Sequence, residues 1–283
     1  MVELHFLVPA YGPSPYLSET LASLAAAADD RCAVTVVDDG SPGTQVAGAA
    51  AAAGVEYVRL PANKGVAGAF QRCAELSRGG YTVLVGSDDV VEPSYVAAVL
   101  DLAERFSRPA MLLPGVRVID GEGRPALPLA DRVKQLLAPS GQVPRLLYGD
   151  RLVASLLTGN WLYFPAIAWR TDLLREYGFR RDMQTALDLD LELRLLFGGE
   201  RLAWSGEPAF RYRRHPSSAS SRTAGSGVRF EEERQIFAWA HDEATARGWA
   251  RSSLAARVHA TARVHRGLTV LSGRVSRSGR RDG

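Results

Sequence analysis

The sequence predicts an α/β fold with a mostly parallel central sheet flanked by helices. Apolar segments rich in β-branched residues alternate with Ala- and Leu-rich segments through the first third of the chain. Alternation of this kind produces parallel strands joined by right-handed helical crossovers. The strands are expected at residues 5–10, 33–37, 55–60 and 81–85, and the helices at 17–28, 44–53 and 67–77.

Local signals place each helix. The first has Leu17, Leu21 and Leu24 on one face. The second is Ala-rich and ends at Gly54, and the Gly79-Gly80 pair ends the third.

The fourth strand, residues 81–85, runs directly into two adjacent carboxylates, Asp88 and Asp89. Its apolar run is typical of a strand covered on both faces. Two carboxylates beside a core repel each other and lose hydration, and a divalent cation relieves both costs. Mg²⁺ takes one or two carboxylates and completes its shell with substrate phosphates. The stretch indicates a metal–diphosphate site; in the alternative, the acids only start a turn and cap the helix after Pro93.

Functional side chains follow three of the predicted strands. They are Pro9 to Tyr11, the pair Asp38 and Asp39, and the pair Asp88 and Asp89. The carboxyl ends of parallel strands share one sheet edge, where open α/β sheets bind ligands. This convergence favours a site over independent turns. No glycine-rich dinucleotide fingerprint follows the first strand, so no nicotinamide or flavin cofactor is expected.

Composition bounds the class of protein. The 283 residues suit one large α/β domain with an appendage, and 46% apolar residues can form a sizeable core. Neither Cys32 nor Cys73 has a metal-type spacing, which favours a reduced, cytoplasmic setting. No signal peptide and no apolar run long enough for a membrane span is present, so a soluble or at most peripheral protein is expected. The net charge is only +3, and no nucleic-acid partner is expected.

Four motifs occur in order: Val8-Pro9-Ala10-Tyr11, Val36-Val37-Asp38-Asp39-Gly40-Ser41, Asn63-Lys64-Gly65 and Ser87-Asp88-Asp89. Each is weak alone, but four in this order are specific. Over about residues 2 to 220 they resemble the motifs of family 2 glycosyltransferases, which have the GT-A (Rossmann-like) fold. The resemblance implies a nucleotide-diphosphate-sugar donor and Mg²⁺ or Mn²⁺ as cofactor.

The resemblance also implies roles for individual residues. The nucleotide-sugar contacts it implies in this part of the chain are Pro9, Ala10, Tyr11, Asp38, Asp39, Asn63, Gly65 and Asp88. Asp89 would ligate the metal. Family members have an arginine where this chain has Phe70, which leaves the nucleobase open. Either Arg72 replaces that arginine or the donor is held differently, and Phe70 itself is expected in the helix core.

The middle of the chain continues the pattern. A helix is expected at 93–105, strands at 110–113, 115–119 and 166–170, and further helices at 131–137 and 151–158. Residues 121–150 are too long for a simple connection, so they form either a lid or acceptor-side loop or a disordered excursion. By the resemblance, Asn160 and Trp161 lie on the acceptor side, where Trp161 either stacks on a sugar ring or belongs to the core.

A helix from about Ala186 to Phe197 carries the candidate base. Asp188, Leu191 and Arg194 match the family's Glu-Asp-x-x-Leu-x-x-Arg pattern, in which the Asp is the general base, while Leu187 replaces the Glu. A carboxylate at a helix start is held ionised by the helix dipole. The alternative is that Asp188 only caps the helix. Asp190 and Glu192 are expected at other angles of the helix and are weaker candidates.

The segment from Tyr212 to Ser218 resembles the family's Tyr-Arg-x-His-x-x-Ser. It implies that Arg214 contacts the diphosphate and that His215 reaches the metal. A strand is expected before it at 201–204, and residues 217–227 are expected to be a mobile loop.

The domain organisation follows from these assignments. Residues 1–225 form the glycosyltransferase domain, with a nucleotide-binding half at 1–105 and an acceptor-binding half at 106–225. Residues 226–283 form a helical extension with a basic tail. The extension either packs on the domain or on a second subunit of a homodimer, or its tail contacts an anionic membrane surface weakly.

The function expected is an inverting, metal-dependent glycosyltransferase with Asp188 as base. The acceptor is a glycan, a lipid or a small molecule. A non-catalytic protein that binds nucleotide or glycan is the alternative, because Leu187 and Phe70 depart from the family pattern. A sugar nucleotidyltransferase is less favoured, because the first strand lacks its Gly-rich basic loop.

Overall fold

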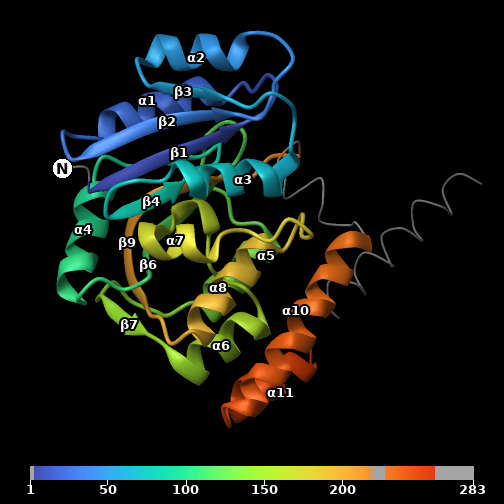
Figure 1. Cartoon of the computed structure of the whole chain (residues 1–283). Helices are drawn as coiled ribbons and strands as arrows, with labels where there is room; N and C mark the ends of the chain where they lie inside the picture. Colours follow the sequence, from blue (N-terminus) through green and yellow to red (C-terminus); the bar gives the residue numbers. More distant parts are fainter. Residues whose placement is uncertain (1–2, 217, 219–226, 259–283) are drawn as a thin grey trace, which may run out of the picture.

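A nine-stranded sheet forms the centre of the molecule (Figure 1). The computed structural model describes residues 3–216, 218 and 227–258. The strands are β1 (Leu4–Ala10), β2 (Cys32–Asp38), β3 (Glu56–Arg59), β4 (Tyr81–Leu84), β5 (Val90–Val91), β6 (Met111–Ile119), β7 (Arg145–Leu147), β8 (Ala168–Arg170) and β9 (Leu202–Arg213). The helices are α1 (Leu17–Ala27), α2 (Gln45–Ala53), α3 (Gly65–Leu76), α4 (Tyr95–Arg105), α5 (Leu129–Leu137), α6 (Gly149–Thr158), the 3₁₀ turn η1 (Phe164–Ala166), α7 (Thr171–Tyr177), α8 (Leu187–Phe197), α10 (Gly227–Ala246) and α11 (Ala250–Val258).

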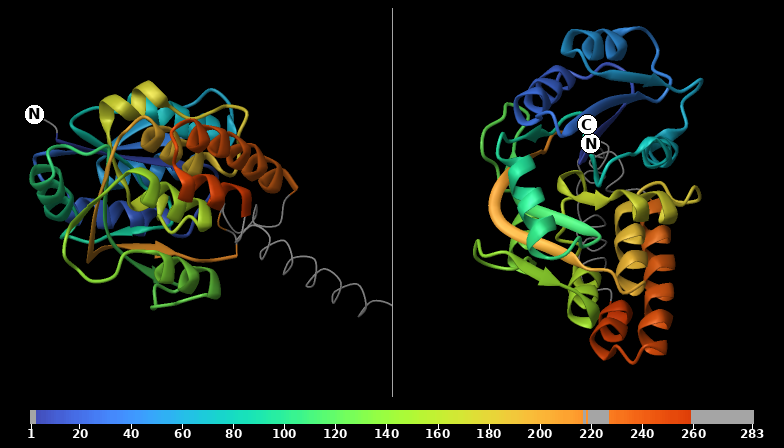
Figure 2. Two further views of the ribbon diagram at one scale, coloured as in Figure 1. Left: turned by 90° about the horizontal axis from the view of Figure 1, so that it is seen from below. Right: turned by 60° about the vertical axis from the view of Figure 1, so that its left-hand side comes forward.

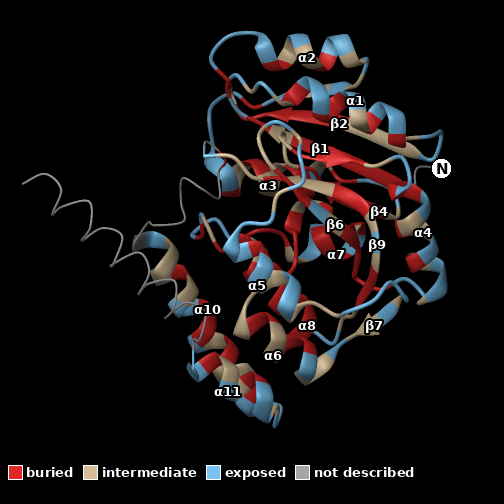
Figure 3. Cartoon of the chain, turned by 180° about the vertical axis from the view of Figure 1, so that it is seen from behind, coloured by how far each residue is buried: buried red, intermediate tan, exposed pale blue. Residues whose placement is uncertain are grey.

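The sheet runs β3-β2-β1-β4-β8-β6-β9-β5, and β7 also pairs with β9. Strands β1 to β4 are parallel to one another, and β6 is parallel to β9, while β8 lies antiparallel between the two groups. The expected α/β fold with a mostly parallel sheet is therefore confirmed. Figure 3 shows β1, β2 and β4 buried, with the exposed surface on the outer faces of the helices.

The strand ends meet as the sequence predicts. Ala10 at the end of β1 pairs with Asp38 at the end of β2, and the N–H of Asp39 continues the ladder to the Ala10 carbonyl at 2.9 Å. On the other side of β1, Leu84 of β4 pairs with Leu7. The three chain segments that follow these strands therefore leave the sheet at one edge.

The structure has elements that the sequence does not predict. Helix α7 and the short strands β5 and β7 are unexpected, and β9 extends far beyond the expected strand 201–204. A proline such as Pro208 usually ends a strand, yet β9 continues past it. The strand can do so because its register to β6 shifts where Pro208 faces Gly115. A Cβ at Gly115 would lie 2.5 Å from the carbonyl oxygen of Gly206, so only glycine allows this close approach.

The C-terminal helices pack on the domain. Helices α10 and α11 lie side by side, against α8 and α6 respectively (Figures 1 and 2). The N–H and the hydroxyl of Ser252 both donate to Oδ1 of Asp150, at 2.8 and 2.6 Å. Packing on the domain or on a second subunit was favoured over membrane contact, and the described helices pack on the domain. The basic tail beyond residue 258 and most of the loop at 217–227 lie outside the described residues. Within the described part, no helix is long and apolar enough to cross a membrane.

Candidate active site

Asp38 is built into the turn that follows β2. Its Oδ1 accepts the N–H of Ser41 at 2.8 Å, and its Oδ2 accepts the hydroxyl of Tyr57 at 2.5 Å. Burial raises the pKa of this carboxyl, but the hydrogen bonds from Ser41 and Tyr57 outweigh it, so the pKa lies below its ordinary value. Asp38 is thus an ionised group that shapes the turn, and both of its oxygens are engaged by the protein.

Asp39 connects two of the sequence motifs. Its Oδ1 accepts the N–H of Lys64 at 2.7 Å, and the Asn63 side chain accepts the N–H of Gly65 at 2.7 Å. Burial raises the pKa of Asp39, while the backbone of the same turn opposes the shift. The carboxylate therefore fixes the Asn63–Gly65 turn beside the ends of β1 and β2. Tyr11 follows the last residue of β1 at this edge of the sheet and is 56% exposed.

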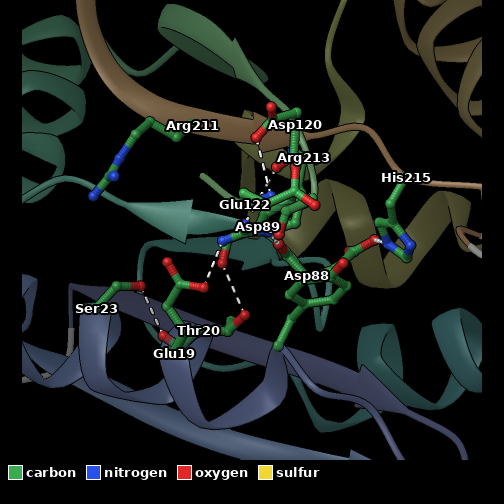
Figure 4. A network of polar contacts seen from close by, with 12 residues as sticks. Glu19, Thr20, Ser23, Asp88, Asp89, Asp120, Glu122, Arg211, Arg213 and His215 are labelled. Carbon is green, nitrogen blue, oxygen red and sulfur yellow. Dashed lines mark hydrogen bonds and ion pairs between the residues drawn. The ribbon is translucent and has the colours of Figure 1, made fainter. Parts of the chain in front are cut away.

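The acidic pair after β4 is held by residues from β9 and beyond (Figure 4). Oδ1 of Asp89 accepts the backbone N–H of Arg213 at 2.8 Å. Nε2 of His215 lies 2.8 Å from Oδ2 of Asp88. The carbonyl of Asp89 accepts the Thr20 hydroxyl from α1 at 2.8 Å. Sequence segments more than a hundred residues apart are thereby joined at the predicted site.

The Arg213 guanidinium connects the acidic pair to helix α1. It donates to the carbonyl of Asp88 at 2.7 Å and to Glu19 at 2.6 Å, and it lies over the ring of Tyr16 at 4.6 Å (Figure 4). Its side chain is only 1% exposed, so it is a buried structural cation. The signal for Arg213 in the sequence is its place as the Arg of the Tyr-Arg-x-His pattern.

Asp89 has the environment of a carboxylate that lacks a counter-ion. Burial, and then the charge of Asp88, raise its pKa well above the ordinary value, while Arg213 opposes this. Its Oδ2 is buried and has no hydrogen-bond partner in the described part of the chain. A Cβ at Gly86 would lie 2.5 Å from this oxygen and 2.8 Å from Oδ1 of Asp88, so both oxygens border the same small gap. An orphaned oxygen beside a second carboxylate fits a divalent cation.

The protein ligands alone do not complete a cation site. Among the described residues, no group of three or more His, Cys, Asp or Glu side chains is arranged to hold a metal. Two carboxylates, with His215 beside Asp88, suit a cation that takes its remaining ligands from a diphosphate.

Helix α8 carries Asp188 in its first turn, where the residue is half-buried. Of its eleven residues, nine are buried, and Asp188 and Arg194 are the two that are not. The Asp188 carboxylate has no hydrogen-bond partner among the described residues, whereas Asp190 accepts a bond from Arg194 at 2.8 Å. Asp190 is therefore a structural ion-pair residue, and Asp188 is available for other chemistry.

The expectation that Glu192 lies at another angle from Asp188 is wrong. Four residues is about one helical turn, so the two share a face of α8. Glu192 is fully buried; its Oε2 accepts the Asn160 amide at 2.8 Å, and its Oε1 has no partner in the described region. Burial, and then the charge of Asp188, raise the pKa of Glu192 well above its ordinary value. The i,i+4 spacing was the sequence signal that identifies this pair.

The insertion at 121–150 is ordered and anchored. Asp131 on α5 is fully buried and accepts two hydrogen bonds from Arg214, at 3.1 and 3.0 Å, and one from Tyr163 at 3.0 Å. Arg214, expected at the diphosphate, is thus held by Asp131 with its side chain 24% exposed. Lys134 donates to the carbonyl of Leu162 at 2.6 Å. Burial lowers the pKa of Lys134 to about 8, although the charge of Asp188 opposes this.

Trp161 lies in the core, and Phe70 is half-buried and packs against the core. Trp161 is 3% exposed, its indole N–H donates to Ser155 at 3.1 Å, and its ring lines a cavity of about 200 Å³ together with Lys134. Phe70 packs against Phe164, with ring centroids 5.1 Å apart, as expected for a core position.

Comparison with known proteins places the fold and the family. Residues 6–168 match the family described as Glycosyl transferase family 2. The 1–349 fragment of S. aureus TarS is similar at 18% identity and a TM-score of 0.62, over 84% of this chain and 65% of that one. The same fragment in complex with UDP-GlcNAc gives 18% identity and a TM-score of 0.64, over 84% and 66%. Its complex with UDP gives 18% and 0.61, over 84% and 65%.

The chain therefore spans less than two thirds of these structures. No curated protein is significantly similar to it in sequence. The family match covers more than half of the residues and includes most of β1, all of β2 to β4 and both acidic pairs. On this evidence the chain belongs to glycosyl transferase family 2.

Proposed function

We propose that this protein is an inverting glycosyltransferase that moves a sugar from a nucleotide diphosphate to an acceptor hydroxyl, with Asp188 as the general base. One observation carries the proposal. Asp188 is the one carboxylate of α8 that no described residue engages by a hydrogen bond, while Asp190 and Glu192 are both held by protein donors. Such a carboxylate accepts a proton from a bound hydroxyl without losing a structural contact.

The donor lies, in this proposal, along the edge formed by the ends of β1, β2 and β4. Ala10, Tyr11 and the turn held by Asp39 contact the nucleoside. TarS structures contain UDP-GlcNAc and UDP, which supports a nucleotide-sugar donor for the shared fold. Pro9 would contribute through its backbone. Asp38 would contribute by shaping the turn after β2, because both of its side-chain oxygens already accept hydrogen bonds from the protein.

Asp88, Asp89 and His215 would hold Mg²⁺ or Mn²⁺ together with the donor diphosphate. The cation would supply Lewis-acid stabilisation of the negative charge on the departing diphosphate. The unpartnered Oδ2 of Asp89 is the observation that favours this assignment.

Asp188 takes the acceptor proton as the hydroxyl oxygen attacks the anomeric carbon. Attack on the face opposite the diphosphate breaks the anomeric bond in a single displacement, so the configuration inverts. Lys134 lies near enough to Asp188 for the charge of Asp188 to act on the pKa of Lys134. Asn160 and Trp161 would support the acceptor side from below rather than contact the acceptor directly, because Asn160 binds Glu192 and Trp161 is buried.

A non-catalytic nucleotide-binding protein is the second candidate. Phe70 stands where the family has an arginine, and its ring is packed against Phe164 and Phe179. Arg72, the other arginine considered for this contact, pairs with Glu75 at 3.1 Å, and an absent cationic contact to the donor would favour binding without efficient turnover.

A donor screen tests the proposal. Melting temperature is measured with UDP, GDP, dTDP and CDP, each with and without Mn²⁺, because a ligand of the folded state raises it. The sugar nucleotides of the diphosphate that binds are then incubated with the protein and assayed for released diphosphate. We expect one base to bind and its donor to be hydrolysed slowly. Binding without release of diphosphate from any donor would support the second candidate, and no binding would contradict both.

A further inference from the structure

We infer that Glu232, on the C-terminal helix α10, is a positioning residue for Asp188, an inference that rests on the proposed function. Glu232 lies outside the family match at 6–168, as does Asp188. The C-terminal extension would then support catalysis by holding Asp188 in place, although Glu232 itself does not contact substrate.

The Glu232 carboxylate binds the backbone just before α8. Its Oε1 accepts the N–H of Gln184 at 2.7 Å. Its Oε2 accepts the N–H of Thr185 at 2.8 Å, the Thr185 hydroxyl at 2.7 Å and the N–H of Ala186 at 3.0 Å. Four donors from three consecutive residues converge on one side chain that is 46 to 48 positions away in the sequence.

These bonds hold the chain where it enters α8. Ala186 is the N-cap residue of α8 and makes no side-chain cap bond. Its N–H is one of the helix-end N–H groups that lack an intrahelical partner, and Glu232 accepts it, while the bonds from Gln184 and Thr185 fix the two residues just before the helix. Asp188 lies two residues beyond Ala186, and its side chain makes no hydrogen bond to any residue that the structure describes. Its position is therefore set by the backbone that Glu232 holds.

The same contacts exclude Asp188 as the cap, which was the alternative reading of the sequence. They also place a negative charge at the positive end of α8. Burial raises the pKa of Glu232, but the hydrogen bonds from Thr185 and the backbone outweigh it and lower the pKa below its ordinary value. An ionised Glu232 offsets the helix field that would otherwise weaken Asp188 as a base.

The helix that carries Glu232 is itself fixed. Ile236 and Phe237 of α10 are buried, and α11 is tied to α6 through Ser252 and Asp150. Helix α10 thus acts as a rigid support for the segment before Asp188 (Figure 2).

The test compares Glu232→Gln with Glu231→Gln. Glu231 is the matched control, because it is exposed and pairs with Arg234 on its own helix. Hydrogen–deuterium exchange of the amides at 184–186 should accelerate in Glu232→Gln and stay at the wild-type rate in the control. For the donor that the screen identifies, kcat should fall about 10- to 100-fold with an unchanged KM, since small displacements of a catalytic group have costs of this size.

Two further readouts separate positioning from general destabilisation. In Glu232→Gln, the acidic limb of the pH profile of kcat should move to lower pH. The positive field at the start of α8 then acts on Asp188 without the opposing negative charge of Glu232. Glu232→Asp keeps the charge and should restore the limb to the wild-type position.

Unchanged exchange at 184–186, or a kcat equal to that of the control, would overturn the inference. So would a fall in activity that follows melting temperature alone, with no shift of the acidic limb. A wild-type protein that turns over no donor would instead overturn the proposed function, and the exchange measurement would still decide whether Glu232 holds the segment before α8.

Discussion

The backbone N–H of Arg213 donates a hydrogen bond of 2.8 Å to Oδ1 of Asp89, which lies 124 residues earlier in the chain. The Arg213 side chain also binds the carbonyl of Asp88 at 2.7 Å. The acidic pair after β4 is therefore oriented by the end of β9. One Asp89 oxygen is satisfied by this contact, and the other has no hydrogen-bond partner among the described residues.

Asp89→Asn should remove the metal-dependent part of nucleotide binding. In the wild-type protein, a nucleotide–Mn²⁺ pair at 100 times its Kd stabilises the fold by about 2.7 kcal/mol. We expect the variant to show the same melting temperature with and without Mn²⁺, because an amide is a poor ligand for this cation. Asp101→Asn, an exposed change on α4, is the control. A Mn²⁺-dependent rise that persists in Asp89→Asn would place the cation elsewhere.

Asp188→Asn should abolish turnover while leaving donor binding intact. The amide keeps the shape of the side chain but accepts no proton, so kcat should fall about 10² to 10⁴-fold. Nucleotide affinity, measured by calorimetry, should stay within about twofold of wild type. Asp182→Asn, which alters an exposed pair with Arg180, should leave both values unchanged. Near-normal turnover in Asp188→Asn would mean that another group is the base.

Glu192→Gln should stabilise the protein at neutral pH and leave it unchanged in acid. The raised pKa means that folded Glu192 binds more protons than unfolded Glu192 does. Stability therefore falls as pH rises from the unfolded pKa through the folded one. Glutamine does not titrate, so the variant should gain about 1 to 3 kcal/mol in urea unfolding at pH 7.

The gain from Glu192→Gln should disappear near the ordinary glutamate pKa of 4.5. Glu104→Gln, an exposed change on α4, should produce no pH-dependent difference. A gain of equal size at every pH would show that packing, and not ionisation, causes it.

Asp131→Asn should release α5 from the domain. The change removes the charge that Arg214 and Tyr163 contact and leaves the guanidinium with a weaker partner. We expect a loss of about 1 to 3 kcal/mol and faster proteolysis within residues 121–148. Glu122→Gln, at an exposed position of the same insertion, should be cleaved at the wild-type rate. Equal cleavage in both variants would contradict an anchoring role for Asp131.

Much of the first half of the molecule was predictable from local patterns. The alternation of apolar strands with Ala-rich helices gives β1 to β4 nearly to the residue, because each element there is specified by its own neighbours. The sharing of one edge by Asp38, Asp39, Asp88 and Asp89 follows from parallel topology alone. The second half was harder to predict from the sequence. Strand β9 continues through Pro208 only because its register to β6 shifts there, and that shift depends on Gly115, which lies in the other strand.

The sequence by itself determined the α/β class, the acidic strand ends and Asp188 as the candidate base. These depend on local propensity and on motif order, which the chain carries without reference to its neighbours in space. Only the tertiary structure decided which partner each carboxylate has. Asp38 accepts a hydrogen bond from Tyr57, Asp131 accepts one from Arg214, and Glu232 accepts one from the backbone at the start of α8. The physical reason is that a hydrogen bond or a burial penalty is a property of the folded pair, and its two members lie 19, 83 and 46 positions apart in the sequence.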